Sequence, residues 1–264
     1  MNSGINLKDF KIPLGKLAPV EKFRTRQGDT LSYRSYPAWS EDLVILYHGA
    51  GSDSRYMCAL AAAIAGQGIA SVITPDFRCH GVSLGNSDKI SKNQLEIDLE
   101  ELLIHIKMQK AVSRITLAGH SMGGGFALRI AVSDLRKQFS KFIALAPHLP
   151  LHLNANQPNF GGWISVDSDG SFTVNYPEVM RTGHEKLHYS AEYLRAVHAA
   201  DDLVEKLQEL KPSLTVVTGA LDEVVVAEKQ REIFAQTSAN VLIVENLNHL
   251  TIVSKVDNYL NIFA

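Results

Sequence analysis

One stretch decides how this chain folds: Ile115-Thr-Leu-Ala-Gly-His-Ser-Met-Gly-Gly-Gly125. Its first residues are apolar or β-branched, as in a buried strand, and a helical pattern begins at Met122. Between the two lies a Gly-x-Ser-x-Gly sequence centred on Ser121. The pentapeptide alone arises by chance in roughly one chain in ten of this length. Its position is the informative part, because a serine on a tight strand-to-helix turn has its Oγ exposed above the sheet.

A reactive serine hydroxyl needs a general base, and that base needs an acid that orients it. Asp222 follows a predicted strand at 214–218, and His249 follows another at 241–244. All three side chains therefore come where strands give way to loops, the edge at which parallel sheets carry their sites. The sequence predicts that Ser121, Asp222 and His249 form one catalytic group.

The rest of the chain alternates short β-branched runs with longer helical patterns. Two of the runs, at 43–47 and 214–218, are continuously apolar, which is typical of strands covered on both faces. We therefore predict an α/β fold, with a mostly parallel central sheet and helices on both faces. Strands are expected at 30–36, 43–47, 70–74, 114–118, 141–145, 214–218 and 241–244, and helices at 55–65, 92–109, 122–133, 227–237 and 250–263.

One acidic group in the predicted helix 92–109 needs an interpretation. Its apolar residues mark one face, so the carboxylates are expected on the opposite, solvated face rather than in a site. They are Glu96, Asp98, Glu100 and Glu101.

The alternation is interrupted between residues 148 and 210, where proline and glycine gather. Within this stretch, 163–174 reads as a hairpin that turns at Asp169-Gly170. We predict a hydrolase-like core formed by 1–147 and 211–264, with 148–210 inserted as a cap. Some apolar residues of the insertion either line an acyl tunnel or form the cap's own small core: Leu149, Leu151, Leu153, Phe160, Trp163, Ile164 and Phe172.

Composition excludes several classes of protein. The 264 residues are 45% apolar and 20% charged, and 26 basic against 28 acidic residues leave a net charge of −2. Without a basic stripe no nucleic-acid partner is expected. The longest uncharged stretch, 57–74, is divided by Gly66-Gln-Gly68, so no integral membrane segment is expected either.

The ends of the chain and its cysteines bear on location. The first twenty residues contain no apolar run of the length that a secretory signal needs. The two cysteines, Cys58 and Cys79, are expected to be free thiols in a cytoplasmic protein, with a single bridge as the alternative. A homodimer is left open.

A competing zinc motif is present within the insertion. His184-Glu-Lys-Leu-His188 matches H-E-x-x-H, which on a helix presents two histidines to zinc. Gly183 stands directly before it and no metalloprotease scaffold surrounds it. A second pair, His148 and His152, is interrupted by Pro150. We expect no metal and no cofactor.

Several motifs together resemble the α/β-hydrolase superfamily. More narrowly, they are similar to the branch of monoacylglycerol lipases, lysophospholipases and serine aminopeptidases. The resemblance covers 43–147 and 213 to the end. Its motifs are HGAGSDSRY at 48–56, DFRCHGVSLG at 76–85, GHSMGG at 119–124, GALDEVV at 219–225 and Asn248-His249.

The resemblance implies a role for particular residues. Ser121 is the nucleophile, Asp222 the acid and His249 the base, with Glu223 the nearest rival for the acid. The N–H groups of Ala50 and Met122 are the oxyanion donors. The chain departs from the family at Cys79, where a glycine is usual.

Other residues near these motifs are expected to serve structure or substrate. Packing or hydrogen bonding is expected for His48 and His120, and bracing of the site for Asp76, Arg78 and Ser83. Substrate contacts are expected from Tyr56, Phe160 and Trp163.

The predicted reaction is two-step acyl transfer to water from a small-molecule carboxylic ester. Short or medium acyl esters, monoacylglycerols and lysophospholipids all fit this chemistry. A serine aminopeptidase, an acyl or thioester transferase and a carbon–carbon hydrolase would use the same three residues. A non-catalytic ligand-binding protein on a hydrolase scaffold is the alternative of another class.

Overall fold

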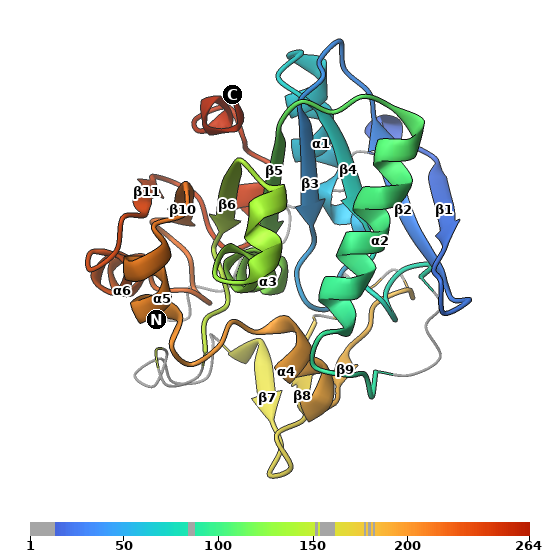
Figure 1. The fold of residues 1–264 in the computed structure, drawn as a ribbon. Helices are drawn as coiled ribbons and strands as arrows, with labels where there is room; N and C mark the ends of the chain where they lie inside the picture. Colours follow the sequence, from blue (N-terminus) through green and yellow to red (C-terminus); the bar gives the residue numbers. More distant parts are fainter. Residues whose placement is uncertain are drawn as a thin grey trace.

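The computed structural model describes residues 14–83, 88–150, 153, 162–176, 178, 181 and 183–264. An eight-stranded sheet forms the centre of the molecule, in the order β1-β2-β4-β3-β5-β6-β10-β11 (Figure 1). Its strands are β1 (Val20–Arg24), β2 (Thr30–Tyr36), β3 (Leu43–Tyr47), β4 (Ser71–Pro75), β5 (Ile115–His120), β6 (Lys141–Leu145), β10 (Leu214–Gly219) and β11 (Asn240–Val244).

The six strands from β4 to β11 in that order run parallel, while β1 and β2 pair antiparallel at one edge. Every residue of β3, β4 and β5 is buried, as the continuous apolar runs predict. The predicted mostly parallel sheet is confirmed. Strand β1 was not predicted, because its sequence Val-Glu-Lys-Phe-Arg buries only Phe23 and otherwise faces solvent.

Helices cover both faces of this sheet. In Figure 1, α2 and α3 lie in front of the strands and α1 lies behind them. The α-helices are α1 (Cys58–Gly66), α2 (Gln94–Gln109), α3 (Met122–Ala131), α4 (Ala191–Val197), α5 (Leu203–Leu210) and α6 (Ala227–Phe234). Short 3₁₀ helices occupy Leu14–Lys16, Ser54–Met57, Asp134–Gln138, Thr251–Val253 and Leu260–Phe263.

The helix predicted over 250–263 is wrong. The chain forms two separate 3₁₀ helices there, Thr251–Val253 and Leu260–Phe263. Local side-chain bonds compete with a continuous helix: the Thr251 hydroxyl donates to Asn248, and the Tyr259 hydroxyl donates to the carbonyl of Ile252. The side chain of Asn248 and the carbonyl of Ile252 thus have partners that a continuous helix over 250–263 would not give them.

A second, three-stranded sheet comes between β6 and β10 in the sequence. It contains β7 (Ile164–Val166), β8 (Phe172–Val174) and β9 (His188–Tyr189), all antiparallel. Gly170 has a φ of 82°, which confirms the turn expected at Asp169-Gly170. In Figure 1 this sheet lies beyond the carboxyl ends of the parallel strands.

Two of the four acidic residues predicted on the solvated face of α2 are instead turned inward. Asp98 is buried and receives two hydrogen bonds, at 2.8 and 2.7 Å, from the guanidinium of the equally buried Arg78. Glu96 pairs with the buried Arg129 at 3.3 Å. A buried guanidinium requires a carboxylate partner, and these positions of α2 supply one. Glu100 is exposed, as predicted, and Glu101 is partly exposed.

The zinc motif does not form a helix. Residues 184–187 have no regular secondary structure and His188 lies in β9, so the spacing does not bring its two histidines to one helix face. Within 14–83, 88–150 and the other described residues, no group of three His, Cys, Asp or Glu side chains is arranged to hold a metal. In that same part of the chain no helix is both long and apolar enough to cross a membrane. Cys58 and Cys79 are not joined.

Candidate active site

Ser121 occupies a strained turn between β5 and α3. Its φ is 53° and its ψ is −113°, a conformation that L-residues rarely adopt. Two glycines make the turn possible, because a Cβ on Gly119 would stand 2.2 Å from the carbonyl oxygen of Gly123. A Cβ on Gly123 would stand 2.6 Å from the carbonyl oxygens of Tyr47, the last residue of β3, and of His48. The Gly-x-Ser-x-Gly spacing is therefore a packing requirement of this turn.

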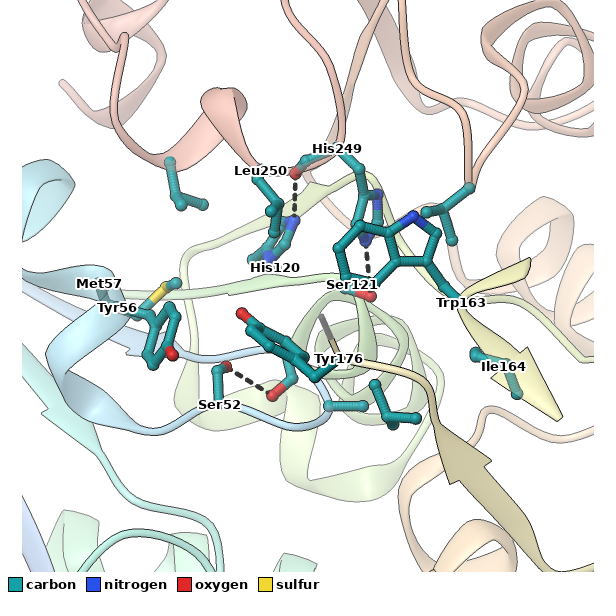
Figure 2. A pocket seen from close by; sticks show the side chains of 15 residues that line it. Ser52, Tyr56, Met57, His120, Ser121, Trp163, Ile164, Tyr176, His249 and Leu250 are labelled. Atoms are coloured by element: carbon teal, nitrogen blue, oxygen red, sulfur yellow. Dashed lines mark hydrogen bonds between the residues drawn. The ribbon is translucent and has the colours of Figure 1, made fainter. Parts of the chain in front are cut away.

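The structure brings together the three residues predicted as a catalytic group, of which Figure 2 shows Ser121 and His249. The Nε2 of His249 lies 3.1 Å from the Oγ of Ser121, and its Nδ1 lies 3.0 and 3.1 Å from the two carboxylate oxygens of Asp222. Asp222 is held in turn by the N–H groups of Val224 and Val225, which donate to its Oδ1 at 2.9 and 2.7 Å. The arrangement is a continuous chain from carboxylate to imidazole to hydroxyl.

Charge around His249 sets its basicity. Burial lowers its pKa, but the charge and hydrogen bond of Asp222 and the charge of Glu223 outweigh that effect and raise the pKa above its usual value. Glu223 also accepts a hydrogen bond from the backbone N–H of His249 at 3.4 Å. Burial raises the pKa of Glu223 itself. A second carboxylate therefore stands beside the imidazole without contacting its ring nitrogens.

Two backbone N–H groups near Ser121 have the positions expected of oxyanion donors. Met122 is the first residue of α3, whose N-terminus carries a partial positive charge. Ala50 lies in the loop that follows β3. In the described part of the chain, neither N–H donates a hydrogen bond to another protein atom. Both N–H groups can therefore donate a hydrogen bond to a ligand that approaches Ser121.

The loop carrying Ala50 is fastened to the small sheet by a tyrosine that the sequence analysis did not single out. The N–H of Gly51 donates to the hydroxyl of Tyr189, in β9, at 2.7 Å. That hydroxyl also lies 2.7 Å from the Nε2 of His80. Tyr189 is completely buried and its ring stacks on Phe172 with centroids 4.5 Å apart. The inserted segment therefore holds the backbone of the loop directly.

The residues expected to brace the site do so. Asp76 accepts hydrogen bonds from the Ser32 hydroxyl at 2.7 Å and from the N–H of Ser54 at 2.8 Å. His48 accepts from the N–H of Phe77 at 3.1 Å, and the Nε2 of His120 lies 2.8 Å from the carbonyl oxygen of His249.

Further bracing contacts involve Arg78 and Ser83. Arg78 pairs with Asp98 and with Asp29. The Ser83 hydroxyl lies 2.9 Å from that of Ser32. These are structural contacts that fix the loops around the serine.

The predicted substrate contacts have two outcomes. Tyr56 and Trp163 both line a small cavity at Ser121, as Figure 2 shows. The Tyr56 hydroxyl donates to Glu185 at 3.3 Å. Tyr176, which the sequence analysis did not name, stands between them, its ring centroid 6.2 Å from that of Tyr56 and 5.8 Å from that of Trp163. Phe160 lies outside the described residues.

Two of the contacts that the sequence analysis missed are long-range ones. Tyr176 and Tyr189 belong to the inserted segment, where no local motif marks them, and only tertiary contact reveals their place.

Cys79, the departure from the family pattern, adopts a φ of 66°. The chain therefore keeps the backbone conformation that suits glycine while carrying a side chain there, at a cost of about 1–2 kcal/mol.

Two cavities meet at Ser121. The smaller, of about 50 Å³, contains His249 and the three aromatic residues of Figure 2 in its wall. The larger, of about 880 Å³, extends between the β7–β8 hairpin and α4 and contains Met122 in its wall. Ser121, Ala50 and Ile164 line both.

The strand order, the strained serine turn and the three loops that meet at the sheet edge define an α/β hydrolase. Within that class, a family model described as serine aminopeptidase, S33 matches residues 40–253. The chain belongs to that family of hydrolases. No curated protein matches the sequence significantly.

Solved structures show the same fold at low sequence identity. An alpha/beta hydrolase, GrgF, from Penicillium sp. sh18 superimposes with a TM-score of 0.69 at 21% identity, covering 92% of this chain and 95% of that one. A thermophilic esterase from Thermogutta terrifontis gives 0.68 at 18%, covering 93% and 96%. A monoglyceride lipase from Saccharomyces cerevisiae gives 0.67 at 17%, covering 96% and 94%.

Proposed function

We propose that this protein hydrolyses carboxylic esters through a covalent acyl-serine intermediate. The observation that carries the proposal is the hydrogen-bonded series from Asp222 to His249 to the Oγ of Ser121, which ends beside two N–H groups without protein partners. An esterase and a lipase among the similar structures support the same class of reaction. Two cavities at the serine provide room for the two halves of an ester.

In the first step His249 takes the proton of Ser121 as its Oγ attacks the ester carbonyl carbon. Asp222 keeps the Nδ1–H tautomer of His249 and stabilises the imidazolium that forms. The carbonyl oxygen becomes an oxyanion, to which the N–H groups of Ala50 and Met122 donate. A single donor of this kind lowers the barrier by about 3–4 kcal/mol.

Collapse of the tetrahedral intermediate breaks the bond to the alkoxy oxygen, and His249 gives that oxygen its proton. The alcohol leaves and Ser121 remains acylated. Water then attacks the acyl carbon while His249 takes its proton, and a second collapse releases the acid and restores the serine. In both steps His249 is the group that accepts the proton and then gives it up.

A peptide substrate receives less support from the site. An aminopeptidase needs an acidic group that receives the substrate's ammonium, and one carboxylate beside the small cavity is Glu185, which contacts Tyr56 of its wall. It already accepts hydrogen bonds from the Tyr56 hydroxyl and from the backbone N–H groups of Gly183 and His184. An uncharged alkoxy group suits this wall better than an ammonium.

Active-site labelling tests the proposal. A fluorophosphonate probe should label the wild-type protein at Ser121, and the Ser121→Ala variant should not be labelled. Thermal unfolding of the variant provides the control for folding. Equal labelling of a folded Ser121→Ala variant would sink the assignment of the nucleophile.

Turnover of p-nitrophenyl esters from C2 to C16 is the companion measurement. Hydrolysis that rises and falls along the series would give acyl preference together with activity. A complete lack of turnover at every length, with the methyl esters of the same acids also inert and probe labelling intact, would count against an ester as the substrate.

A further inference from the structure

The two cavities at Ser121 contain different parts of the proposed catalytic group. His249 lines the small cavity and not the large one, while Met122 lines the large cavity and not the small one. Ser121 and Ala50 line both, so an ester carbonyl at the serine lies at the junction. The two halves of a bound ester must then extend into different cavities.

Proton transfer decides which half goes where. The Nε2 of His249 has to reach the alkoxy oxygen to protonate the leaving alcohol, so the alcohol lies on the side that His249 lines. The acyl group takes the remaining direction, past Met122 and into the large cavity. We infer, on the basis of the proposed function, that this protein cleaves esters of bulky apolar acids with very small alcohols.

The volumes match that division. The side with His249 encloses about 50 Å³. A cavity needs about 10–15 Å³ of such space to hold one water, so this side suits an alkoxy group of only a few atoms. The side with Met122 encloses about 880 Å³. That lies within the range of about 300–1,000 Å³ found for sites that bury a drug-sized molecule.

Packed aromatic rings form part of the wall of the small side. Tyr176 contacts Trp163 on one side and Tyr56 on the other, with its centroid 5.8 and 6.2 Å from theirs. Tyr56 and Tyr176 are each about 5% exposed or less. A longer alkoxy chain would have to displace these rings, which are tied to one another and, through the Tyr56 hydroxyl, to Glu185.

The wall of the large side is mostly apolar, with polar groups that include the buried Arg129 and the partly buried His148, whose backbone N–H donates to the carbonyl of Ser121. Ile164, Phe172 and Leu194 contribute apolar surface, and the exposed Lys92 and Arg195 are also part of its wall. A long or branched acyl group therefore finds apolar surface on this side, for which the small side has no room.

A pair of isomeric esters tests the inference. Methyl hexanoate and pentyl acetate share one formula and differ only in which side of the carbonyl carries the chain. We expect kcat/KM for methyl hexanoate to exceed that for pentyl acetate by about tenfold or more, since each misplaced methylene costs about 1–3 kcal/mol. An equal or reversed ratio overturns the assignment of the two cavities.

Other outcomes separate this inference from the proposed function. Hydrolysis of p-nitrophenyl esters with neither isomer cleaved would overturn the preference for small alcohols and leave the esterase proposal standing. Absence of turnover with every ester, in a protein that the fluorophosphonate probe still labels, would overturn both.

Two substitutions should move the ratio in opposite directions. Trp163→Ala opens the small side, so the ratio of methyl hexanoate to pentyl acetate should fall about tenfold. Leu194→Trp fills the large side, so methyl hexanoate should lose rate relative to methyl acetate by a similar factor. Because each readout is a ratio of two substrates in one preparation, it does not depend on the fraction of the variant that folds. Unchanged ratios in both variants would contradict the inference.

Discussion

Two walls enclose the serine, and they are built differently. The first wall is the carboxyl edge of the central sheet, where backbone geometry places the groups: Ser121 is strained, and the glycines around it allow carbonyl oxygens to approach closely. The second wall comes from the described residues between β6 and β10, where side chains hold the groups in place. Trp163, Tyr176 and Tyr189 reach the site from short strands and connecting loops.

The difference has a consequence for substitution. In the first wall the backbone holds the catalytic groups within hydrogen-bond distance of one another. A change that shifts this backbone breaks those bonds whatever the substrate, so it should affect turnover with every ester. A side-chain wall can be altered one ring at a time, so changes there should alter which ester is preferred. Tyr189 is the exception that tests this division, because it belongs to the second wall and contacts the first.

The largest effect should come from the first wall. Asp222→Asn removes the charge that stabilises imidazolium and favours the wrong tautomer, so kcat should fall about 10⁴-fold, the scale known for this substitution in a serine protease. Ester turnover together with thermal unfolding measures it. Glu223→Gln, at the neighbouring position, is the matched control and should lose little at its optimal pH. If both variants lost rate equally, Glu223 would share the role of the acid.

An intermediate effect is expected at the contact between the walls. Tyr189→Phe removes the hydroxyl that holds Gly51, so the Ala50 N–H should lose its alignment and kcat should fall by about tenfold to a hundredfold, part of the 10²–10³ that one donor contributes. KM should change little. Binding of a trifluoromethyl ketone, which forms an oxyanion, should weaken in parallel.

Tyr193→Phe is the control for that variant. Its hydroxyl donates to the carbonyl of Arg78 at 3.1 Å and lies near the same His80. These bonds do not involve the loop after β3 that carries Ala50 and Gly51. It should retain near-normal turnover and ketone binding. Equal losses in the two variants would mean that the buried tyrosines support only stability.

A smaller effect concerns pH. His249 must be neutral to act as a base, and its pKa is raised above 6.5, so kcat/KM should rise with pH and reach half its maximum above pH 6.5. Glu223 contributes to that raised pKa, so Glu223→Gln should move the midpoint to lower pH. A pH–rate profile of both proteins measures the shift. A midpoint that stays in place would show that Glu223 does not influence the imidazole.

The smallest effect should appear in stability. Burial lowers the pKa of His120 in the first wall and of His198 beside the second, and it lowers that of His148 to about 4. A histidine with a depressed folded-state pKa binds protons preferentially when unfolded. The unfolding temperature should therefore fall as pH is lowered from 6.5 towards 4. A flat profile over that window would argue that these rings accept protons in the folded protein.

Much of the first wall was predictable from the sequence. Strand β3 and its loop, the Gly-x-Ser-x-Gly turn and the strand-end positions of Asp222 and His249 all follow from local patterns, because continuous apolar runs and glycine spacing are direct records of backbone constraints. Strand β1 was not predictable in this way, since it is an exposed edge strand with one buried residue.

Contacts between distant segments were much less accessible. Asp98 looks like a surface residue in a helical pattern, and nothing near it in sequence announces the buried Arg78. Tyr189 lies beside a misleading zinc motif, and its bond to Gly51 joins residues 138 positions apart. Such pairings depend on tertiary packing, which periodicity does not encode.

The place where the inserted segment leaves and rejoins the sheet has a consequence for the history of this protein. Strands β6 and β10 are direct, parallel neighbours, with Phe142 opposite Leu214, so the chain leaves β6 at the carboxyl edge of the sheet and returns to the amino edge through α5, two fixed points on adjacent strands. Closing a longer loop between two fixed ends costs only about 0.6 kcal/mol for each doubling of its length. Evolution can therefore lengthen, shorten or exchange this segment while the inherited sheet keeps its register. A foreign segment grafted between the same two strands should be tolerated for the same reason. The graft must again supply a hydroxyl or other acceptor for the N–H of Gly51, as Tyr189 does.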